Sequence, residues 1–338
     1  MMKSHILRVL VSIVLLSIVV PPAATAKPVI VASVGKDQLA FIGNQSGSQN
    51  QVCTVDIDGG NLKRLTDVTK SALQPSFSSD GKTLAFIDGT TLWTMDANGK
   101  GSIKAAKDIQ SSYAWAPDGK HIIYPVINSP AIKMTPLDGS DSVTLPINGG
   151  RLSIAPDGLH MSFFDGLYFK VSEFPPTTNS DMGFVLDARG EKAHLHQGDP
   201  RTYWSNDSAM VLLPADGNIS QFSLVSGKTI DLTESPSDNA APCWSLDSKR
   251  IAFSSNRHGR YDIFIMDASG NNETSLTKDA GNNTSPLWTS DGRIVFLSDR
   301  DDGKLTKLYI MNADGSNQKR LTTSAMGSES QPSIYRPK

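Results

Sequence analysis

The sequence predicts an all-β propeller, with seven four-stranded blades as the expected count and six as the alternative. One sequence motif recurs along most of the chain: an apolar or aromatic residue followed by Ser-x-Asp-Gly and an apolar run. A second motif, an alternating apolar run that ends in a glycine turn, follows most copies of the first. After residue 26, no segment shows the three- and four-residue apolar spacing of an amphipathic helix.

The first motif has an aspartate at a fixed position, and successive aspartates are 38, 39, 50, 40 and 44 residues apart. These aspartates are Asp80, Asp118, Asp157, Asp207, Asp247 and Asp291. Short alternating strands bounded by Asp-Gly or Asn-Gly turns are typical of β-hairpins, because glycine supplies the positive φ that such turns need. Each unit therefore holds four strands. A further hairpin arm at residues 35–42 brings the count to seven units.

The ring needs a strand that closes it. Residues 331–335 repeat the start of a unit and are followed by only three more residues. We expect this segment to complete the N-terminal unit, whose other strands lie within residues 39–66, and so to remove a free strand edge. Residues 29–34 are the alternative candidate for the same slot.

Composition and targeting signals limit the classes of function. The 338 residues contain 32 Lys+Arg and 34 Asp+Glu, so bulk electrostatic binding of nucleic acid is not expected. Residues 1–26 combine a basic start, an apolar run and an Ala-x-Ala site, as in a secretory signal peptide. We therefore expect a periplasmic or secreted mature chain, residues 27–338, which forms one propeller domain without a membrane span. Cys53 and Cys243 are expected to be separate buried thiols.

The units resemble TolB-type, WD40-like propeller repeats. The resemblance is carried most clearly by residues 251–267 and 288–315 and is weaker between 150 and 235. It implies a place in the cell envelope beside protein partners. TolB itself has a six-bladed propeller behind an α/β domain, and seven units leave no room for that domain here. Similar propellers also occur in peptidases and lyases, so the resemblance alone does not fix the function.

Catalytic motifs are not evident. There is no Gly-x-Ser-x-Gly elbow and no complete phosphate-binding or calcium-binding loop. His194 and His196 are the one metal-like pair, since alternate residues of a strand face the same side. We expect no catalytic residue and no cofactor. Tryptophans recur at the first strand of four units and are expected in the core: Trp115, Trp204, Trp244 and Trp288.

The longest spacing between the repeated aspartates suggests an inserted loop. We expect the extra residues within 165–183, between the second and third strands of that unit, on the rim opposite the Asp-Gly turns. This loop carries Tyr168, Phe174 and Met182, and the same rim would carry further candidate partner-binding residues, Arg257, His258, Arg260, Arg300 and Asp301. Exposed aromatic and arginine side chains suit a protein contact. The alternative is an extra hairpin packed on the rim.

These observations favour an exported, non-catalytic, monomeric propeller that binds a protein or peptide partner in the cell envelope. The alternative is a metal-dependent, carbohydrate-active, lyase-like propeller enzyme. A third reading is a structural or sensory module within a larger envelope assembly.

Overall fold

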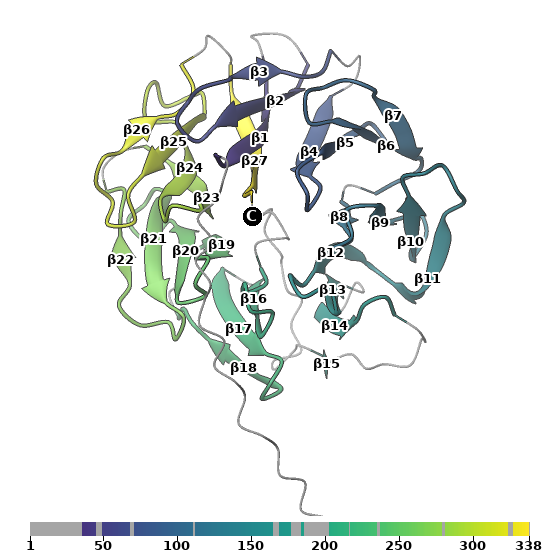
Figure 1. Ribbon diagram of the computed structural model, residues 1–338. Coiled ribbons are helices and arrows are strands. Elements are labelled where there is room, and N and C mark those ends of the chain that lie inside the picture. Colours follow the sequence, from purple (N-terminus) through teal and green to yellow (C-terminus); the bar gives the residue numbers. More distant parts are fainter. Residues whose placement is uncertain are drawn as a thin grey trace, which may run out of the picture. The chain divides into compact units, whose positions relative to one another are not determined.

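The computed structural model describes residues 36–44, 49–67, 71–110, 112–164, 169–176, 184–185, 203–215, 217–234, 237–278, 281–323 and 327–337. All of them belong to one compact unit, Ala32–Lys338. Within this unit seven antiparallel sheets follow one another around a ring (Figure 1), and no helix occurs among the described residues. The chain is a seven-bladed β-propeller, so the predicted fold class and the count of seven are confirmed.

The blades are numbered from the one that contains the first described strand. Blade 1 contains β27 (Glu329–Tyr335), β1 (Gln38–Gly43), β2 (Gln51–Asp56) and β3 (Lys63–Arg64). Blade 2 contains β4 (Ala72–Phe77), β5 (Thr83–Asp88), β6 (Thr91–Asp96) and β7 (Ile103–Ala106). Blade 3 contains β8 (Ala114–Trp115), β9 (His121–Pro125), β10 (Ala131–Pro136) and β11 (Val143–Asn148).

Blade 4 contains β12 (Gly150–Ile154), β13 (His160–Phe164), β14 (Phe169–Glu173) and β15 (Phe184–Val185). Blade 5 contains β16 (Met210–Ala215), β17 (Asn218–Ser223) and β18 (Lys228–Asp231), and a Trp204–Val211 bridge stands in the place of its innermost strand. Blade 6 contains β19 (Asn239–Trp244), β20 (Arg250–Ser255), β21 (Asp262–Asp267) and β22 (Thr274–Ser275). Blade 7 contains β23 (Asn283–Trp288), β24 (Ile294–Ser298), β25 (Lys307–Met311) and β26 (Lys319–Arg320).

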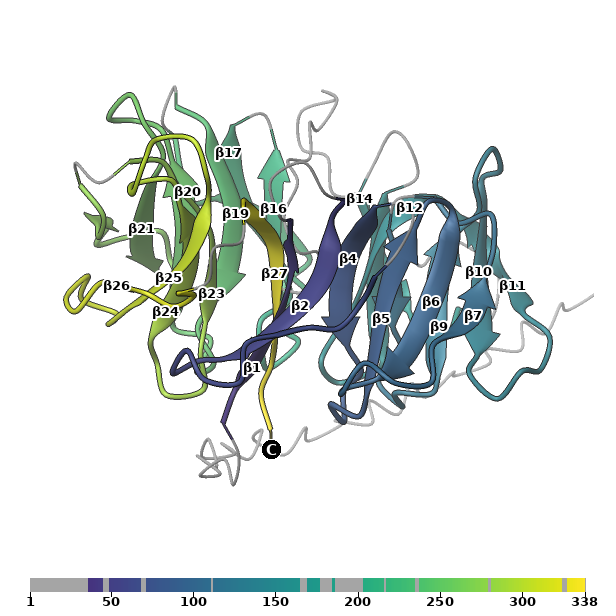
Figure 2. The ribbon, with the colours of Figure 1, turned by 90° about the horizontal axis from the view of Figure 1, so that it is seen from above.

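The two ends of the described chain meet in blade 1. The last strand, β27, pairs antiparallel with β1, with Leu39 opposite Ile334 and Ala40 opposite Ser333 (Figure 2). This confirms that the segment 331–335 closes the ring. Residues 29–34, the alternative candidate, lie outside the described residues.

The repeated aspartate builds the turn between the first and second strands. In blade 2 the Ser78 hydroxyl donates to Asp80 Oδ1 over 2.7 Å and accepts the Thr83 N–H over 3.0 Å. The Ser78 hydroxyl and the Lys82 N–H lower the pKa of Asp80. Blades 5, 6 and 7 repeat the hydroxyl–carboxylate bond at Ser205–Asp207, Ser245–Asp247 and Thr289–Asp291.

Blades 3 and 4 keep the aspartate but replace the hydroxyl. Ala116 and Ala155 stand at the serine position, and a histidine three residues after the aspartate contacts its carboxylate instead. His121 Nδ1 lies 2.6 Å from Asp118 Oδ2, and His160 Nδ1 lies 3.1 Å from Asp157 Oδ2. The aspartates of the repeat therefore have a structural function in each of these turns.

Neighbouring turns of this kind are also bonded to one another. The Ser79 hydroxyl donates to Pro117 O over 2.9 Å, linking blades 2 and 3. Asp157 N–H donates to Ser208 Oγ, and Asn206 N–H donates to Ser248 Oγ, both over 2.9 Å. We call this side of the ring the Asp-Gly rim. Its polar groups largely satisfy one another.

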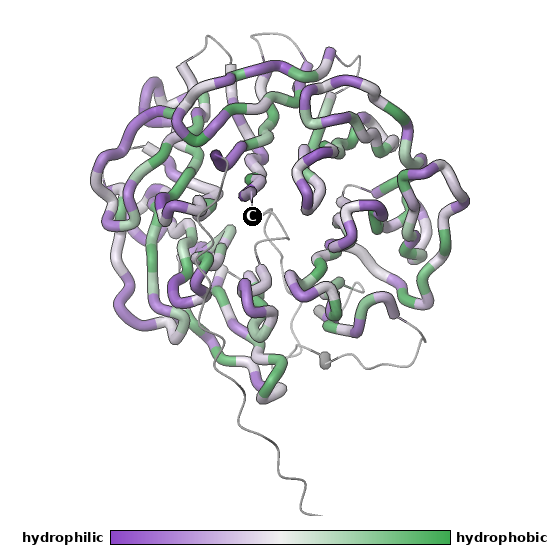
Figure 3. The backbone as a smooth tube through the Cα atoms, in the orientation of Figure 1, coloured by the Kyte–Doolittle hydropathy of each residue, from purple (hydrophilic) through white to green (hydrophobic). Residues whose placement is uncertain are grey.

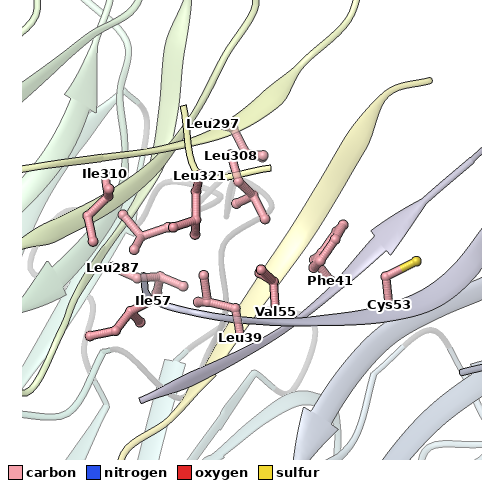
Figure 4. Close-up of a cluster of buried hydrophobic side chains, with 11 residues drawn as sticks. Leu39, Phe41, Cys53, Val55, Ile57, Leu287, Leu297, Leu308, Ile310 and Leu321 are labelled. Carbon is pink, nitrogen blue, oxygen red and sulfur yellow. The ribbon is translucent and has the colours of Figure 1, made fainter. Parts of the chain in front are cut away.

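Apolar clusters fill the spaces between adjacent blades. The cluster between blades 7 and 1 joins Leu39, Phe41 and Val55 to leucines and Ile310 of blade 7 (Figure 4). Hydrophobic residues gather within the blades, whereas hydrophilic residues run along much of the outer edge (Figure 3). The four repeated tryptophans are 1–7% exposed, which confirms their predicted place in the core. Cys53 and Cys243 are buried and form no disulfide with each other, also as predicted.

Replacing Trp288 with alanine should lower the free energy of unfolding by about 3–5 kcal/mol, because the indole is 1% exposed between blades 6 and 7. Urea unfolding followed by circular dichroism measures this loss. The matched control is Trp93→Ala, since Trp93 is only partly buried and should cost clearly less. Equal losses would contradict the assignment of Trp288 to the inter-blade core.

Removing residues 329–338 should lower stability by several kcal/mol, because it exposes the edge of β1 and the apolar residues that β27 covers. Thermal unfolding measures the loss. Removal of residues 337–338 alone is the control and should leave the melting temperature nearly unchanged. An unchanged melting temperature for the longer deletion would show that β27 does not hold the ring.

Candidate functional site

Three long loops lie next to one another on the rim opposite the Asp-Gly rim. Between the second and third strands, blades 6, 7 and 1 have connections 256–261, 299–306 and 44–50, of six, eight and seven residues. The corresponding connections of blades 2 to 5 have two, five, four and two residues. Blades 7 and 1 are neighbours because β27 closes the ring, so the three loops are contiguous. We call the surface formed by loops 256–261 and 299–306 and by the described ends of loop 44–50, residues 44 and 49–50, the crescent.

An arginine at the base of the blade 6 loop contacts three strands of its blade and the residue that precedes the fourth. Arg257 donates from Nε to Ser255 Oγ over 3.0 Å and from NH2 to Asn239 Oδ1 over 3.1 Å. It also forms an ion pair with Glu273 beside the outermost strand. The guanidinium carbon lies 4.4 Å from the centroid of the Phe264 ring on β21.

Arg300 repeats this arrangement in blade 7. It donates to Ser298 Oγ over 2.9 Å, to Asn283 Oδ1 over 2.9 Å and to Gln318 Oε1 over 2.6 Å. Its guanidinium carbon lies 4.6 Å from the centroid of the Tyr309 ring. The two arginines therefore brace the blades beneath the crescent, and their donors are largely used within the chain.

The remaining candidates from the sequence lie on the surface of the crescent. His258 is exposed, and its Nδ1 lies 3.2 Å from Asp262 Oδ2. Arg260 is exposed and has no hydrogen-bond or ion-pair partner within the described ranges. Asp301 accepts from Arg320 NH1 over 3.1 Å and from the Tyr309 hydroxyl. Burial, reinforced by Asp301, raises the pKa of Tyr309 to about 12.

In blades 6 and 7 the first residue of the crescent loop is bonded to the residue that precedes the first strand of the same blade. Asp238 N–H donates to Asn256 Oδ1 over 2.9 Å, and Asn256 N–H donates to Asp238 O over 3.2 Å. Blade 7 repeats this exchange with the side chains swapped, since Asn282 N–H and Nδ2 donate to the Asp299 carboxylate and Asp299 N–H donates to Asn282 O. Loops fixed in this way present exposed side chains with little ordering cost on binding.

The inserted loop of blade 4 is not where the sequence placed it. The segment 169–173 forms the third strand, β14, so residues 165–168 connect the second and third strands. Two longer connections follow it: 174–183 between the third and fourth strands, which belongs to the Asp-Gly rim, and 186–203 between β15 and the Trp204 bridge of blade 5. The prediction failed because spacing between repeats counts inserted residues without showing which side of a short strand they fall on.

Phe174 therefore lies on the opposite rim from Arg257 and Arg300. Its N–H donates to Leu159 O over 2.7 Å, beside the Asp157–Gly158 turn, and its partly buried ring packs against the cluster between blades 3 and 4. Tyr168, Met182, His194 and His196 lie outside the described residues. Among the described residues no group of three or more His, Cys, Asp or Glu could hold a metal ion.

Several supporting residues were not identified from the sequence. Asn239, Asn283, Glu273 and Gln318 hold the two arginines, and loop 44–50 completes the crescent. A signal for the arginines was present, because Ser-Asn-Arg and Ser-Asp-Arg occur at equivalent places 43 residues apart. The described ranges also include no helix with the length and apolar character that crossing a membrane requires.

Known proteins share sequence with part of this propeller. A family model described as the TolB beta propeller domain matches residues 205–336. An uncharacterized protein of Agrobacterium fabrum is 28% identical over 182 residues, 51% of this chain and 58% of its own. The Tol-Pal system protein TolB of Francisella tularensis subsp. mediasiatica is 22% identical over 172 residues, 50% of this chain and 37% of its own. The matched part of this chain thus covers 58% of the length of the first of these relatives and less of the second.

Solved structures show the same architecture. TolB from Acinetobacter baumannii superposes with a TM-score of 0.57 at 17% identity, covering 91% of this chain and 69% of that one. A Mycobacterium tuberculosis puromycin-hydrolyzing peptidase gives 0.61 at 14% identity, covering 84% and 53%. At such identities the likeness shows the fold alone. Over residues 205–336 this seven-bladed propeller is therefore similar to the TolB beta propeller domain.

Replacing Arg257 with alanine should lower the free energy of unfolding by about 1–3 kcal/mol, because Asn239 and Glu273 lose a charged partner. Denaturant unfolding measures the loss, and Arg257→Lys should recover only part of it because lysine lacks the planar fork. Arg260→Ala is the matched control, three residues away in the same loop, and should change stability by less than about 0.5 kcal/mol. Similar losses for both alanine variants would contradict the bracing function.

Proposed function

We propose that this chain is an exported TolB-type propeller that binds a protein partner in the cell envelope through the crescent. The observation that carries the proposal is the contiguity of the three longest second-to-third-strand loops on a braced rim. Recognition commonly resides on variable loops that a rigid scaffold holds in place. The opposite rim is built from repeated turns whose polar groups are bonded to one another.

The relatives support an envelope function. Two matched proteins carry the name TolB, and one is named a Tol-Pal system protein. Residues 1–26 have the pattern of an export signal, which agrees with a periplasmic or secreted place of action. We propose that the mature protein acts as a monomer, without a cofactor and without binding nucleic acid.

Within the crescent, exposed and bracing side chains have different functions. His258, Arg260 and Asp301 are exposed on loops that Arg257 and Arg300 anchor to the blades. Leu305 adds a 37% exposed apolar side chain on the blade 7 loop. Such a mixture of arginine, ring and apolar groups on a preorganised base suits a protein interface. Phe174 is not part of this surface, because it lies on the other rim.

The double variant Arg260→Ser with Leu305→Ser, which changes two exposed side chains of the crescent, should weaken partner binding by at least about tenfold, or about 1.4 kcal/mol, while leaving the melting temperature unchanged. The partner is first identified by crosslinking from an envelope extract, and its affinity is then measured with purified proteins. The matched control is Leu159→Ser with Val225→Ser, which changes two exposed apolar residues on the Asp-Gly rim. Lost binding in the control with full binding in the crescent variant would assign the interface to the Asp-Gly rim instead.

A further inference from the structure

A threonine near the end of the fourth strand fixes the start of the third strand in three blades. In blade 1 the Thr66 hydroxyl donates to Gln51 Oε1 over 2.9 Å and accepts the Val52 N–H over 2.9 Å. Blade 5 repeats this with Thr233 and the Asn218 side chain, and blade 6 repeats it with Thr277 and the Asp262 carboxylate. In each case an acceptor from the blade itself satisfies the threonine hydroxyl.

Blade 7 has a lysine at the place of that acceptor. Lys307 begins β25, and the Thr322 hydroxyl donates instead to Glu329 Oε2 over 2.7 Å. The Leu308 N–H donates to the same oxygen over 2.8 Å. Glu329 belongs to β27, the strand that pairs with β1. A carboxylate from the closing strand therefore completes the polar network of blade 7.

Glu329 is enclosed at the seam between blades 7 and 1. Its side chain is fully buried, and Oε1 has no hydrogen-bond partner within the described part of the chain. The charged groups that face it are Lys307 on β25 and Arg320 on β26, and the Cys53 thiol on β2 feels its charge. Burial raises the pKa of Glu329, although the donors Thr322 and Leu308 and the two cations oppose this rise.

Lys307 does not neutralise the buried carboxylate by direct contact. Its Nζ donates to Gly327 O over 2.6 Å, and the residue is only 5% exposed. Burial lowers the pKa of Lys307. In the closed ring, burial therefore makes the charged form less favourable for both Lys307 and Glu329. Parting of β1–β3 from β27 and blade 7 would give Glu329 access to water.

We propose that the ring opens reversibly at the seam where β1–β3 of blade 1 meet β27 and blade 7, and that ionisation of Glu329 promotes this opening. The seam is the one place in the described ring where a blade is assembled from both ends of the chain. A carboxylate that binds its proton more tightly in the closed ring stabilises closure at low pH. That stabilisation is lost as the pH rises from the ordinary range of a glutamate through the raised pKa.

The two buried cysteines provide a matched pair of probes. Cys53 is 0% exposed in the cluster between blades 7 and 1 (Figure 4), and Cys243 is 2% exposed in the cluster between blades 6 and 7. A thiol reagent reaches each only after local opening. The ratio of their labelling rates cancels the common rise in thiolate content with pH and compares the opening of the two junctions.

The experiment labels the native protein from about pH 5 to about pH 8 and measures both rates by mass spectrometry. We expect Cys53 to react at least about tenfold faster than Cys243, and the ratio to rise at least about threefold across this range. Glu329→Gln keeps an oxygen acceptor for Thr322 and Leu308 but cannot ionise. In this variant the ratio of the Cys53 to the Cys243 labelling rate should therefore not change with pH. Equal rates at both cysteines, or the same rise in the glutamine variant, would overturn the proposal.

Hydrogen exchange tests the proposal in the wild-type chain, independently of whether the variant folds. Amides of β1 and β27 should exchange about tenfold faster than those of β20 and β21, and this gap should widen with pH. Equal protection of the two strand pairs, or a gap that is constant with pH, would overturn the proposal.

Discussion

Antiparallel pairing between β27 and β1 is the contact on which the ring depends. Each blade buries its faces against two neighbours, so an open array would leave two apolar sheet faces in water. The closing strand removes this cost, because it adds the innermost strand to blade 1 and brings that blade against blade 7. The cluster from Leu39 to Leu321 forms only when this pairing is made. The same pairing places the blade 1 loop beside the blade 7 loop and so assembles the crescent.

The two rims of the ring use their polar residues differently. On the Asp-Gly rim the repeated aspartate binds a serine or threonine hydroxyl, or a histidine where alanine replaces the serine. These turns then bond to their neighbours, so their chemistry maintains the ring. On the other rim, Arg257 and Arg300 hold the blades from within, and exposed side chains occur above them. A rigid base with exposed side chains at its surface is an arrangement suited to binding.

Departures from the repeat show where one blade depends on another. Lys307 occupies a place that Gln51, Asn218 and Asp262 fill with acceptors, and Glu329 from the closing strand supplies the missing oxygen. The replacement joins blade 7 to the C-terminal strand by a buried carboxylate. It also makes the seam chemically unlike the other junctions between described blades. The lysine at position 307 is thus compensated by a carboxylate from the neighbouring blade and not by a residue of blade 7 itself.

Periodicity in the sequence alone determined the strands, the glycine turns, the count of seven blades and the burial of the repeated tryptophans. These follow from interactions between residues close in the chain, and from a pattern that recurs about every 40 residues. The position of the extra residues in blade 4 was assigned wrongly, because β14 is a five-residue strand that spacing cannot place. The sequence also singled out Arg257 and Arg300, but as contact residues rather than as braces. Only the tertiary structure joined loop 44–50 to loop 299–306, because residues some 250 positions apart become neighbours through ring closure, which leaves no local signal in the chain.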